Sequence, residues 1–387
     1  MKLAFLADKS APFFTGGYER RIWRLARAAS KSHEVQVFTS MGEMQRVIDG
    51  VAFARVAPLA FNETDSGSRS LVHSSLFALS QLCETVSRWD PDVLYIESIP
   101  YIHLPVLDRG LRKCSCRVIL NVNEAWHTYA NYGKLPKVLT RKAMAWCLTK
   151  GIGFSDVTLA VSSVTAQSLR TNFGATNVQV LENGVDIPTS VIQQNAASHY
   201  QYDFIMIGRL VAIKRNADFL RALHTLALDY GWKGRAAIVG DGPLLGRLRT
   251  EAQSLGLGSR VDFPGRVSEE KKYELLRKAR VYVLCSEREG QSLSTLEAFS
   301  IGLPAIVAVP PSDEIFGVAS MAKDRVNALY YPLGDVVSLT SAMSSIVSDP
   351  KLLQELSISA RATSLGYGWD SIERRFEEIV RNLGAPN

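Results

Sequence analysis

Two glutamates stand eight positions apart in a polar segment that follows the apolar run Val281–Cys285. The segment reads Ser286-Glu287-Arg288-Glu289-Gly290-Gln291-Ser292-Leu293-Ser294-Thr295-Leu296-Glu297. We expect Glu289 on a loop and Glu297 about one turn into the next helix. The backbone amides of residues 291–294 would then face outward at a helix N-terminus. Hydrogen bonds and the helix dipole both favour a diphosphate at such a place.

The two carboxylates allow more than one chemistry. A carboxylate placed just after such amides can accept hydrogen bonds from two adjacent hydroxyls, as on a ribose. Two carboxylates near a sugar could instead be the acid and the nucleophile of a glycoside hydrolase. A solvated acidic loop is the third interpretation. A phosphate-binding helix between the carboxylates favours an activated sugar donor over hydrolysis.

Glycines and cations follow other apolar runs. Gly208-Arg209-Leu210, with Lys214 five residues after Arg209, follows the run Phe204–Ile207. A guanidinium fork and an ammonium suit two adjacent phosphates, although such a pair can also be two solvated charges. Gly240-Asp241-Gly242-Pro243 follows a further run and is typical of a structural turn before a helix.

Thr15-Gly16-Gly17 precedes a helical pattern near the start of the chain. Adjacent glycines let backbone N–H groups approach a phosphate or sugar oxygen, but they are equally consistent with a flexible turn. The chain has no G-x-G-x-x-G segment, so hydride transfer from a dinucleotide lacks its usual support.

These motifs need strands and helices to position them, and the sequence supplies both in alternation. Short apolar runs predict strands at 2–7, 34–39, 93–97, 117–121, 157–161, 178–181, 204–207, 236–239, 261–263, 281–285 and 305–309. Helical patterns lie at 19–31, 74–87, 137–151, 217–230, 243–255, 268–279, 294–301, 337–348 and 370–383. Strands that are apolar almost throughout are typical of parallel sheets covered on both faces. The alternation therefore predicts an α/β fold with two Rossmann-like domains facing each other across a cleft.

As an ordered set, the motifs resemble the retaining glycosyltransferases of family 4 (group 1), which have the GT-B fold of two Rossmann-like domains. The resemblance is carried by Glu289…Glu297, Gly208–Lys214, Gly240–Pro243, Asn183-Gly184-Val185-Asp186 and Thr15–Gly17, and it spans nearly the whole chain. It implies an acceptor-side domain at 1–188, a linker at 189–202, a donor domain at 203–368 and a C-terminal helix at 369–387 that packs back on the first domain.

The resemblance also implies roles for single residues. Arg209 and Lys214, with Gly208, would hold the diphosphate of a nucleoside diphosphate sugar, and the amides of Gly16 and Gly17 would close over it. Glu297 would bind the ribose and Glu289 the transferred sugar. The stretch 263–267, including Val267, would flank the base, with UDP favoured over GDP. No cofactor beyond this co-substrate is expected.

The chain departs from the family pattern at two places. Many relatives have Phe-Gly where this chain has Gln291-Ser292. Many also carry a His-Asp pair after the fourth or fifth strand of the first domain, where this chain has Asn123-Glu124. Glu124 can take the place of the acid. His127 is the candidate to replace the imidazole, and a purely structural histidine is its alternative.

Composition bears on the compartment of the protein, on metal binding and on the kind of partner. The 387 residues carry a net charge of +6, of which residues 1–200 hold +5. Five cysteines form no disulfide framework, and no signal peptide or membrane span is visible, so we expect a cytoplasmic protein. The six histidines are scattered and no Asp-x-Asp is present, so no metal site is expected. The nearly neutral second half disfavours nucleic acid as a partner.

The basic half suggests contact with an anionic partner. Arg20, Arg24, Arg27 and Lys31 share one stripe of the helix at 19–31. Residues 111–150, with Lys137 and Arg141, hold eight basic side chains against one acid. We expect these cations to face anionic lipid on the cytoplasmic side of a membrane or a lipid-linked or glycan acceptor. A solvated helix face and a phosphorylated soluble acceptor are the alternatives.

Two other functions fit the same architecture. A nucleotide-sugar epimerase would convert the donor without an acceptor. A non-catalytic scaffold would bind the nucleotide sugar only, and the altered position Asn123 is the feature that favours it. Intact Arg209, Lys214, Glu289 and Glu297 favour a metal-independent hexosyltransferase over both.

Overall fold

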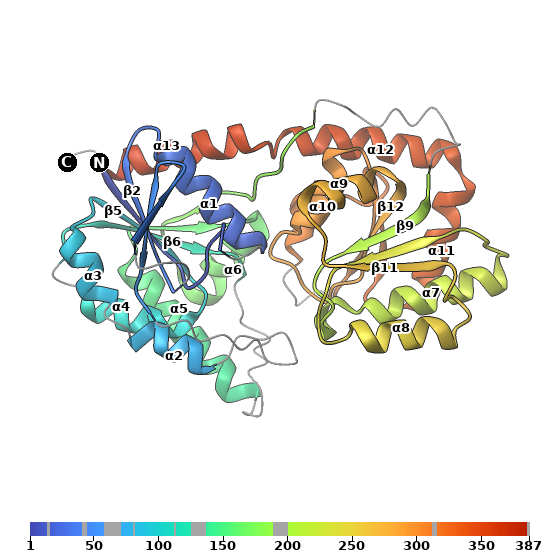
Figure 1. Ribbon diagram of the computed structural model, residues 1–387, viewed down its shortest axis with the longest axis horizontal. Coiled ribbons are helices and arrows are strands. Elements are labelled where there is room, and N and C mark those ends of the chain that lie inside the picture. The colour runs from blue at the N-terminus through green and yellow to red at the C-terminus, as the bar shows by residue number, and fades with distance from the viewer. Residues whose placement is uncertain are drawn as a thin grey trace. The chain divides into compact units, whose positions relative to one another are not determined.

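The computed structural model describes residues 1–13, 16–40, 45–57, 71–79, 82–111, 114–124, 137–188, 200–311 and 316–384. These residues form two compact units. The first lies within Met1–Thr64, Ser68–Gly184 and Asp370–Asn387, and the second within Val185–Trp369. Each unit is an α/β layer structure around a mainly parallel sheet (Figure 1). The predicted fold class of two Rossmann-like domains is confirmed.

The sheet of the first unit has the strand order β3-β4-β2-β1-β5-β6-β7-β8. All neighbours pair in parallel except β3 and β4, which form an antiparallel hairpin. The strands are β1 (Lys2–Leu6), β2 (Glu34–Thr39), β3 (Gln45–Ile48), β4 (Val51–Arg55), β5 (Val93–Glu97), β6 (Arg117–Val122), β7 (Val157–Ala160) and β8 (Val178–Val180). The central strands β1 and β5 are almost completely buried, as their sequences predict, since these are apolar except for Lys2 and Glu97 at their ends.

Helices cover both faces of this sheet. Figure 1 shows α1 and α13 on one face and α2, α3, α4 and α5 on the other. The helices of the first unit are α1 (Gly17–Ala29), α2 (Leu71–Leu79), α3 (Leu82–Trp89), η1 (Tyr101–His103), α4 (Leu104–Gly110), α5 (Lys137–Phe154), α6 (Ser163–Phe173) and α13 (Trp369–Gly384).

The sheet of the second unit is parallel throughout, in the order β11-β10-β9-β12-β13-β14. Its strands are β9 (Tyr202–Ile207), β10 (Ala236–Val239), β11 (Val261–Gly265), β12 (Ala279–Leu284), β13 (Ala305–Val309) and β14 (Ala328–Pro332). Its helices are η2 (Ala212–Lys214), α7 (Asn216–Asp229), α8 (Leu245–Ser254), α9 (Glu269–Arg277), α10 (Leu293–Ser300), η3 (Gly317–Ser320), α11 (Val336–Ser348) and α12 (Pro350–Leu365).

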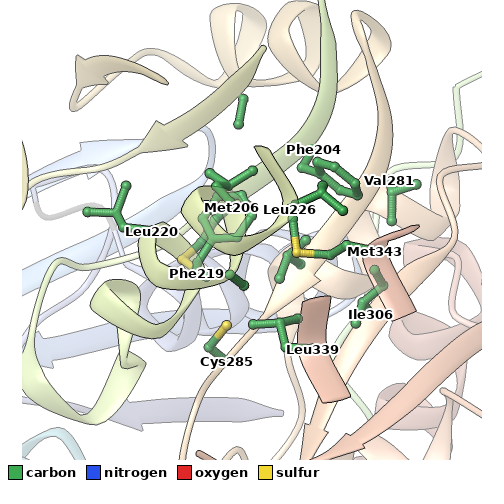
Figure 2. Packing of buried hydrophobic residues seen from close by; sticks show 14 of the residues in the cluster. Phe204, Met206, Phe219, Leu220, Leu226, Val281, Cys285, Ile306, Leu339 and Met343 are labelled. Carbon is green, nitrogen blue, oxygen red and sulfur yellow. The ribbon is translucent and has the colours of Figure 1, made fainter. Parts of the chain in front are cut away.

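Successive residues of the second sheet enter two separate cores. Phe204 and Met206 of β9 pack in the core with Phe219 of α7 and Met343 of α11, as Figure 2 shows. Ile205, between them in the sequence, packs in the core on the opposite face. Strand side chains alternate between faces, so a strand buried on both sides must be apolar at every position.

The C-terminal helix α13 belongs to the first unit. The Phe376 ring lies 5.9 Å from that of Phe5 on β1 and 5.8 Å from that of Tyr95 on β5. Arg375 pairs with Glu182 just after β8, with Nη1 and Oε2 2.6 Å apart. The last helix of the chain thus closes one face of the first sheet.

Several elements were not foreseen from the sequence. They are the strands β3, β4 and β14 and the helices α4, α6 and α12, while the single helix expected at 74–87 is the pair α2 and α3. The hairpin β3–β4 turns at Asp49-Gly50, both with positive φ, a turn that this dipeptide favours. Of the helices in the described ranges, none is long and apolar enough to cross a bilayer.

Candidate active site

The strand order of the second sheet brings the predicted motifs to one edge. β9 and β12 are neighbours, but the chain proceeds from β9 towards β10 and from β12 towards β13, in opposite directions. Such a reversal leaves a crevice outside the carboxyl ends of the two strands, where α/β proteins bind ligands. Arg209 and Lys214 follow β9, and Glu289 follows β12, so they leave the sheet on either side of this point.

The loop that carries Arg209 is fixed by the turn after β10. Leu210 N donates to Asp241 O at 2.9 Å, and Leu244 N donates to Leu210 O at 3.1 Å. Gly240 has φ 138°, and a Cβ there would lie 1.9 Å from Gly208 O. Only glycine fits such a close approach at positive φ. The turn therefore has the structural role that its sequence predicts, and it positions the exposed Arg209.

Lys214 and Glu289 form an ion pair across the two loops. Lys214 Nζ lies 2.5 Å from Glu289 Oε1, with the side chains 27% and 12% exposed. Glu287 N donates to Ile213 O at 2.9 Å, which joins the two loops through their backbones. The ammonium thus compensates the Glu289 charge and stays accessible enough for an anionic ligand to share it.

The helix α10 begins where the sequence places it. Ser292 is its N-cap, and its hydroxyl accepts from Thr295 N at 3.3 Å. The N–H groups of Leu293 and Ser294 belong to the first turn and have no acceptor within the helix. They can bind an anion, and the helix dipole favours one there.

Tyr282 is a positioning residue of this edge that sequence reasoning missed. Its hydroxyl lies 2.7 Å from Ser294 Oγ and 3.3 Å from Ile207 O, so it links the end of β9 to the first turn of α10. Burial raises the pKa of Tyr282, and the charges of Glu289 and Glu297 raise it further. The hydroxyl therefore stays protonated. A hydroxyl among the apolar residues Val281, Val283 and Leu284 was the available signal.

Glu297 is held by a lysine that was also missed. Lys272 Nζ lies 2.7 Å from Glu297 Oε1 and 2.9 Å from Glu269 Oε2, and the side chains of Lys272 and Glu297 are nearly buried. Lys272 comes from α9, so only the packing of α9 against α10 brings it here. Val267 follows β11 at the same carboxyl edge of the sheet and is half-buried.

The first unit carries a buried polar cluster at the carboxyl edge of its own sheet. Glu97 ends β5, and its carboxylate accepts from Asn121 Nδ2 at 3.1 Å and from the Asn123 side-chain amide. Arg21 of α1 donates to Asn121 Oδ1 at 3.3 Å and to Leu181 O at 2.7 Å. Arg21, Glu97 and Asn121 are fully buried.

The candidate residues of the first unit have different surroundings. Glu124 is half-buried, and its carbonyl accepts from the Tyr101 hydroxyl at 2.5 Å. Gly16 is the N-cap of α1, and a Cβ there would lie 2.1 Å from Glu19 Oε2. The chain's own carboxylate therefore already lies at this helix N-terminus. His127 and Thr15 lie outside the described residues.

Two cations of the basic stripe of α1 have acidic partners within the first unit, which the sequence did not predict. Arg24 Nε lies 3.3 Å from Glu373 Oε1 of α13, and Arg27 Nη1 lies 3.7 Å from Asp49 Oδ2. The charge of Lys31 also acts on Glu373. The sequence alone hid this because the acids lie on β-hairpin and C-terminal segments. The side chains of Lys137 and Arg141 are outside the described part, and Arg20 is half-buried.

No metal-binding group is found among the described residues, in which no three His, Cys, Asp or Glu side chains gather as possible ligands. Positive charge at the edge of the second sheet includes that of Arg209, Lys214 and the α10 N-terminus.

Family models match both halves of the chain. The model described as Glycosyltransferase Family 4 matches residues 15–188, and the one described as Glycosyl transferases group 1 matches residues 189–363.

Curated relatives agree with these matches. The chain is 24% identical to the 2-deoxystreptamine N-acetyl-D-glucosaminyltransferase of Streptomyces fradiae over 95% of this chain and 91% of that protein. It is 30% identical to a GalNAc-alpha-(1->4)-GalNAc-alpha-(1->3)-diNAcBac-PP-undecaprenol alpha-1,4-N-acetyl-D-galactosaminyltransferase of Campylobacter jejuni, over 46% of this chain and 48% of that protein. The chain spans from 18% to about half the length of several other curated relatives.

Solved structures share the fold over the whole chain. Sucrose-phosphate synthase from Thermosynechococcus elongatus superimposes with a TM-score of 0.80 at 16% identity, covering 99% of this chain and 98% of that one. The Anabaena protein HepE in complex with UDP-glucose gives a TM-score of 0.72 at 17% identity, covering 99% and 100%.

Proposed function

Since the chain belongs to the group 1 glycosyltransferases and is a transferase with a nucleotide-sugar donor, we propose that it transfers the sugar to an acceptor hydroxyl with retention of anomeric configuration. UDP is the proposed nucleotide, and the UDP-glucose bound by the structurally similar HepE supports this choice. No cofactor beyond the nucleotide sugar is part of the proposal.

One observation supports the donor site most directly: three groups that can bind an anion lie at one edge of the second sheet. Arg209 and Lys214 follow β9, and the N-terminus of α10 follows the neighbouring strand β12. The diphosphate would bind among them. Glu297, one turn further along α10, would accept hydrogen bonds from the ribose hydroxyls, and Glu289 would contact the transferred sugar.

The proposed reaction follows from this charge distribution. The bond from the sugar C1 to the diphosphate oxygen breaks, and a bond from C1 to the acceptor oxygen forms on the same face. The acceptor proton goes to an oxygen of the departing diphosphate. Lys214, Arg209 and the α10 amides stabilise the charge that develops on the diphosphate. Glu289 is assigned no nucleophilic role, since Lys214 already engages its carboxylate at 2.5 Å.

The acceptor proposed here is a lipid-linked or glycan hydroxyl, reached from the cytoplasmic side of a membrane. The Campylobacter jejuni relative acts on an undecaprenol-linked glycan, which supports this class. The five cysteines are free thiols, as expected in a reducing compartment. Glu124, with or without His127, is the proposed contact of the first unit with the reacting sugars.

The relatives with named activities support a transferase over the epimerase and the non-catalytic scaffold. Incubation of the purified protein with UDP-glucose and no acceptor tests both alternatives. Acceptor-independent conversion of the sugar would support an epimerase. A complete lack of donor hydrolysis in that incubation, and of transfer when acceptors are added, with nucleotide binding intact, would support a scaffold.

A ligand screen and a product analysis test the proposal directly. Thermal unfolding is measured with UDP, GDP, ADP and their sugars, because a ligand of the native state raises the unfolding temperature by mass action. We expect the largest increase with UDP or a UDP-sugar. The anomeric proton coupling in the NMR spectrum of the product then reports stereochemistry. An inverted product would contradict the retaining mechanism.

A further inference from the structure

One face of α5 presents large apolar side chains and cations to solvent. Leu139 is 64% exposed and Trp146 is 52% exposed. Lys142, Ala143 and Lys150 are exposed on the same helix. At about 100° per residue, all five fall within one third of the helix circumference. We call Leu139, Lys142, Ala143, Trp146 and Lys150 the α5 face.

The opposite side of α5 is fixed in the core of the first unit. Met144, Cys147 and Leu148 are buried there. A Cβ at Gly151 would lie 2.8 Å from Leu104 Cδ1 and 3.2 Å from Leu120 Cδ2, so the helix backbone packs closely against α4 and β6. The helix cannot rotate to bury Trp146 without giving up this packing. The exposure of the α5 face is thus set by the fold.

The charge of α5 has one sign. Its sequence KVLTRKAMAWCLTKGIGF contains four basic residues and no acid. Within the part of the chain that the structure describes, no carboxylate lies within 4.0 Å of Lys142 or Lys150. The stripe of α1 differs, because Arg24 and Arg27 have Glu373 and Asp49 as acidic partners.

Further apolar groups are exposed on neighbouring elements. Leu79 at the end of α2 is 79% exposed, and Ile102 of η1 is 39% exposed. The short helix η1 contacts both α2 and α5. Figure 1 shows α2, α4 and α5 on the same face of the first sheet. Exposed apolar side chains are thus present on α2 and η1 as well as on α5.

We propose that the α5 face docks on an anionic lipid surface. Trp146 would lie at the level of the headgroups, where the amphipathic indole is favoured. Leu139 would insert beside it, and Lys142 and Lys150 would extend to the lipid phosphates. This inference rests on the proposed function in one respect, since a membrane-bound acceptor gives the contact its purpose.

The chemistry of the α5 face fits a second copy of the chain less well. Self-association would bring two helices of uniform positive charge together, and like charges repel. Protein interfaces are also depleted in lysine, whereas membrane-surface helices are enriched in it.

Vesicle co-sedimentation tests the proposal without donor or acceptor. The full-length protein is mixed with phosphatidylcholine vesicles and with vesicles that also contain phosphatidylglycerol. We expect binding to the anionic vesicles only, weakening as salt screens the attraction. Trp146→Ala should lower the partition coefficient about tenfold or more. Lys142→Glu combined with Lys150→Glu should lower it by about 30-fold or more, from the attraction that each cation near an anionic surface supplies.

Matched controls come from the second unit. Tyr230 is 56% exposed, and Lys233 and Lys351 are exposed as well. Tyr230→Ala, and Lys233→Glu combined with Lys351→Glu, should leave vesicle binding unchanged. Thermal unfolding of each variant should match the wild type, since the replaced side chains are on the surface.

Three outcomes would overturn the docking proposal. They are equal binding of the wild type to neutral and anionic vesicles, α5 variants that bind as the wild type does, and a change from dimer to monomer in Trp146→Ala by sedimentation velocity. UDP binding measured on the same samples separates this failure from failure of the proposed function. A protein that binds UDP but not vesicles loses only the docking surface.

Discussion

The two sheets carry charged residues at corresponding edges, but these residues are accessible to solvent in the second sheet and buried in the first. At the edge of the second sheet, the Lys214–Glu289 pair and Arg209 are partly accessible, next to the open first turn of α10. At the edge of the first sheet, Arg21 and Glu97 are fully buried, and amides and carbonyls surround them. Both edges lie where the strand order reverses, between β1 and β5 and between β9 and β12.

The difference shows that topology offers a crevice and side chains decide its use. In an accessible ion pair, the cation can bind an anionic ligand in addition to its own carboxylate, because the ligand can reach it from solvent. A buried charged group acquires its partners when the protein folds, and removing one of them lowers the free energy of unfolding. We therefore expect substitutions at the second edge to change binding and turnover, and those at the first edge to change stability.

The largest expected effect is that of Arg21→Met on stability. The change removes a fully buried guanidinium that donates to Leu181 O, Glu182 O and two asparagine side chains, and it leaves these acceptors without this donor. We expect the free energy of unfolding of the first unit to fall by about 3–5 kcal/mol. Urea denaturation measures it. Arg27→Met, at a surface pair, is the control and should cost no more than about 1 kcal/mol.

An Arg21→Met protein that unfolds at the same urea concentration as the wild type would contradict the stabilising role of the first edge. An Arg21→Met protein that remains folded but has lost UDP binding would also contradict it, because the first edge would then affect donor binding.

Lys214→Ala should have the next largest effect, on turnover. Loss of the ammonium removes charge stabilisation of the departing diphosphate, which we expect to lower kcat by about 100- to 1,000-fold. Steady-state kinetics with a UDP-sugar measures it. Lys271→Ala on α9, at an exposed pair with Glu274, is the matched control. Turnover of Lys214→Ala at the wild-type rate would remove Lys214 from the mechanism.

Glu297→Gln should weaken binding of the ribose part of the donor without affecting binding of its diphosphate. The amide is a poorer acceptor for ribose hydroxyls and leaves Lys272 without one of its two carboxylates. We expect UDP to bind about tenfold more weakly. Inorganic pyrophosphate should bind as it does to the wild type. Isothermal titration calorimetry with both ligands measures this. A parallel loss for pyrophosphate would place Glu297 at the diphosphate.

The smallest effect concerns Glu373 in the α1–α13 contact. Burial raises the pKa of Glu373, although Arg24 and Lys31 act in the opposite direction. A raised pKa in the folded state means that stability falls as pH rises through the carboxyl range. Relative to the wild type, Glu373→Gln should therefore gain stability between acidic and neutral pH, by less than about 1 kcal/mol.

Chemical denaturation at two pH values measures the Glu373→Gln difference. A variant that becomes less stable than the wild type as pH rises would show that the ion pair with Arg24 outweighs the burial.

Much of the framework was predictable from local sequence. Unbroken apolar runs gave most of the strands, since a strand between two helical layers has no polar face. Asp49-Gly50, the N-caps Ser162 and Asp349 and the helix-starting Pro350 are local signals for β3–β4, α6 and α12 that the periodicity alone did not include.

Residue pairing was not predictable in the same way. Lys272 lies 25 positions from Glu297, and Glu373 is far along the chain from Arg24. Glu97, Asn121 and Arg21 come from three different elements. No spacing rule joins such residues. The stripe of α1 looked like an open basic surface because the acids that compensate it lie elsewhere in the sequence.

The sequence by itself determined the α/β architecture, the Glu289…Glu297 segment at a helix start and the all-basic composition of α5, because strand apolarity, capping and net charge are local properties. The tertiary structure decided which charges are compensated and which remain accessible. That outcome depends on which elements pack together, and it distinguishes the compensated stripe of α1 from the exposed face of α5.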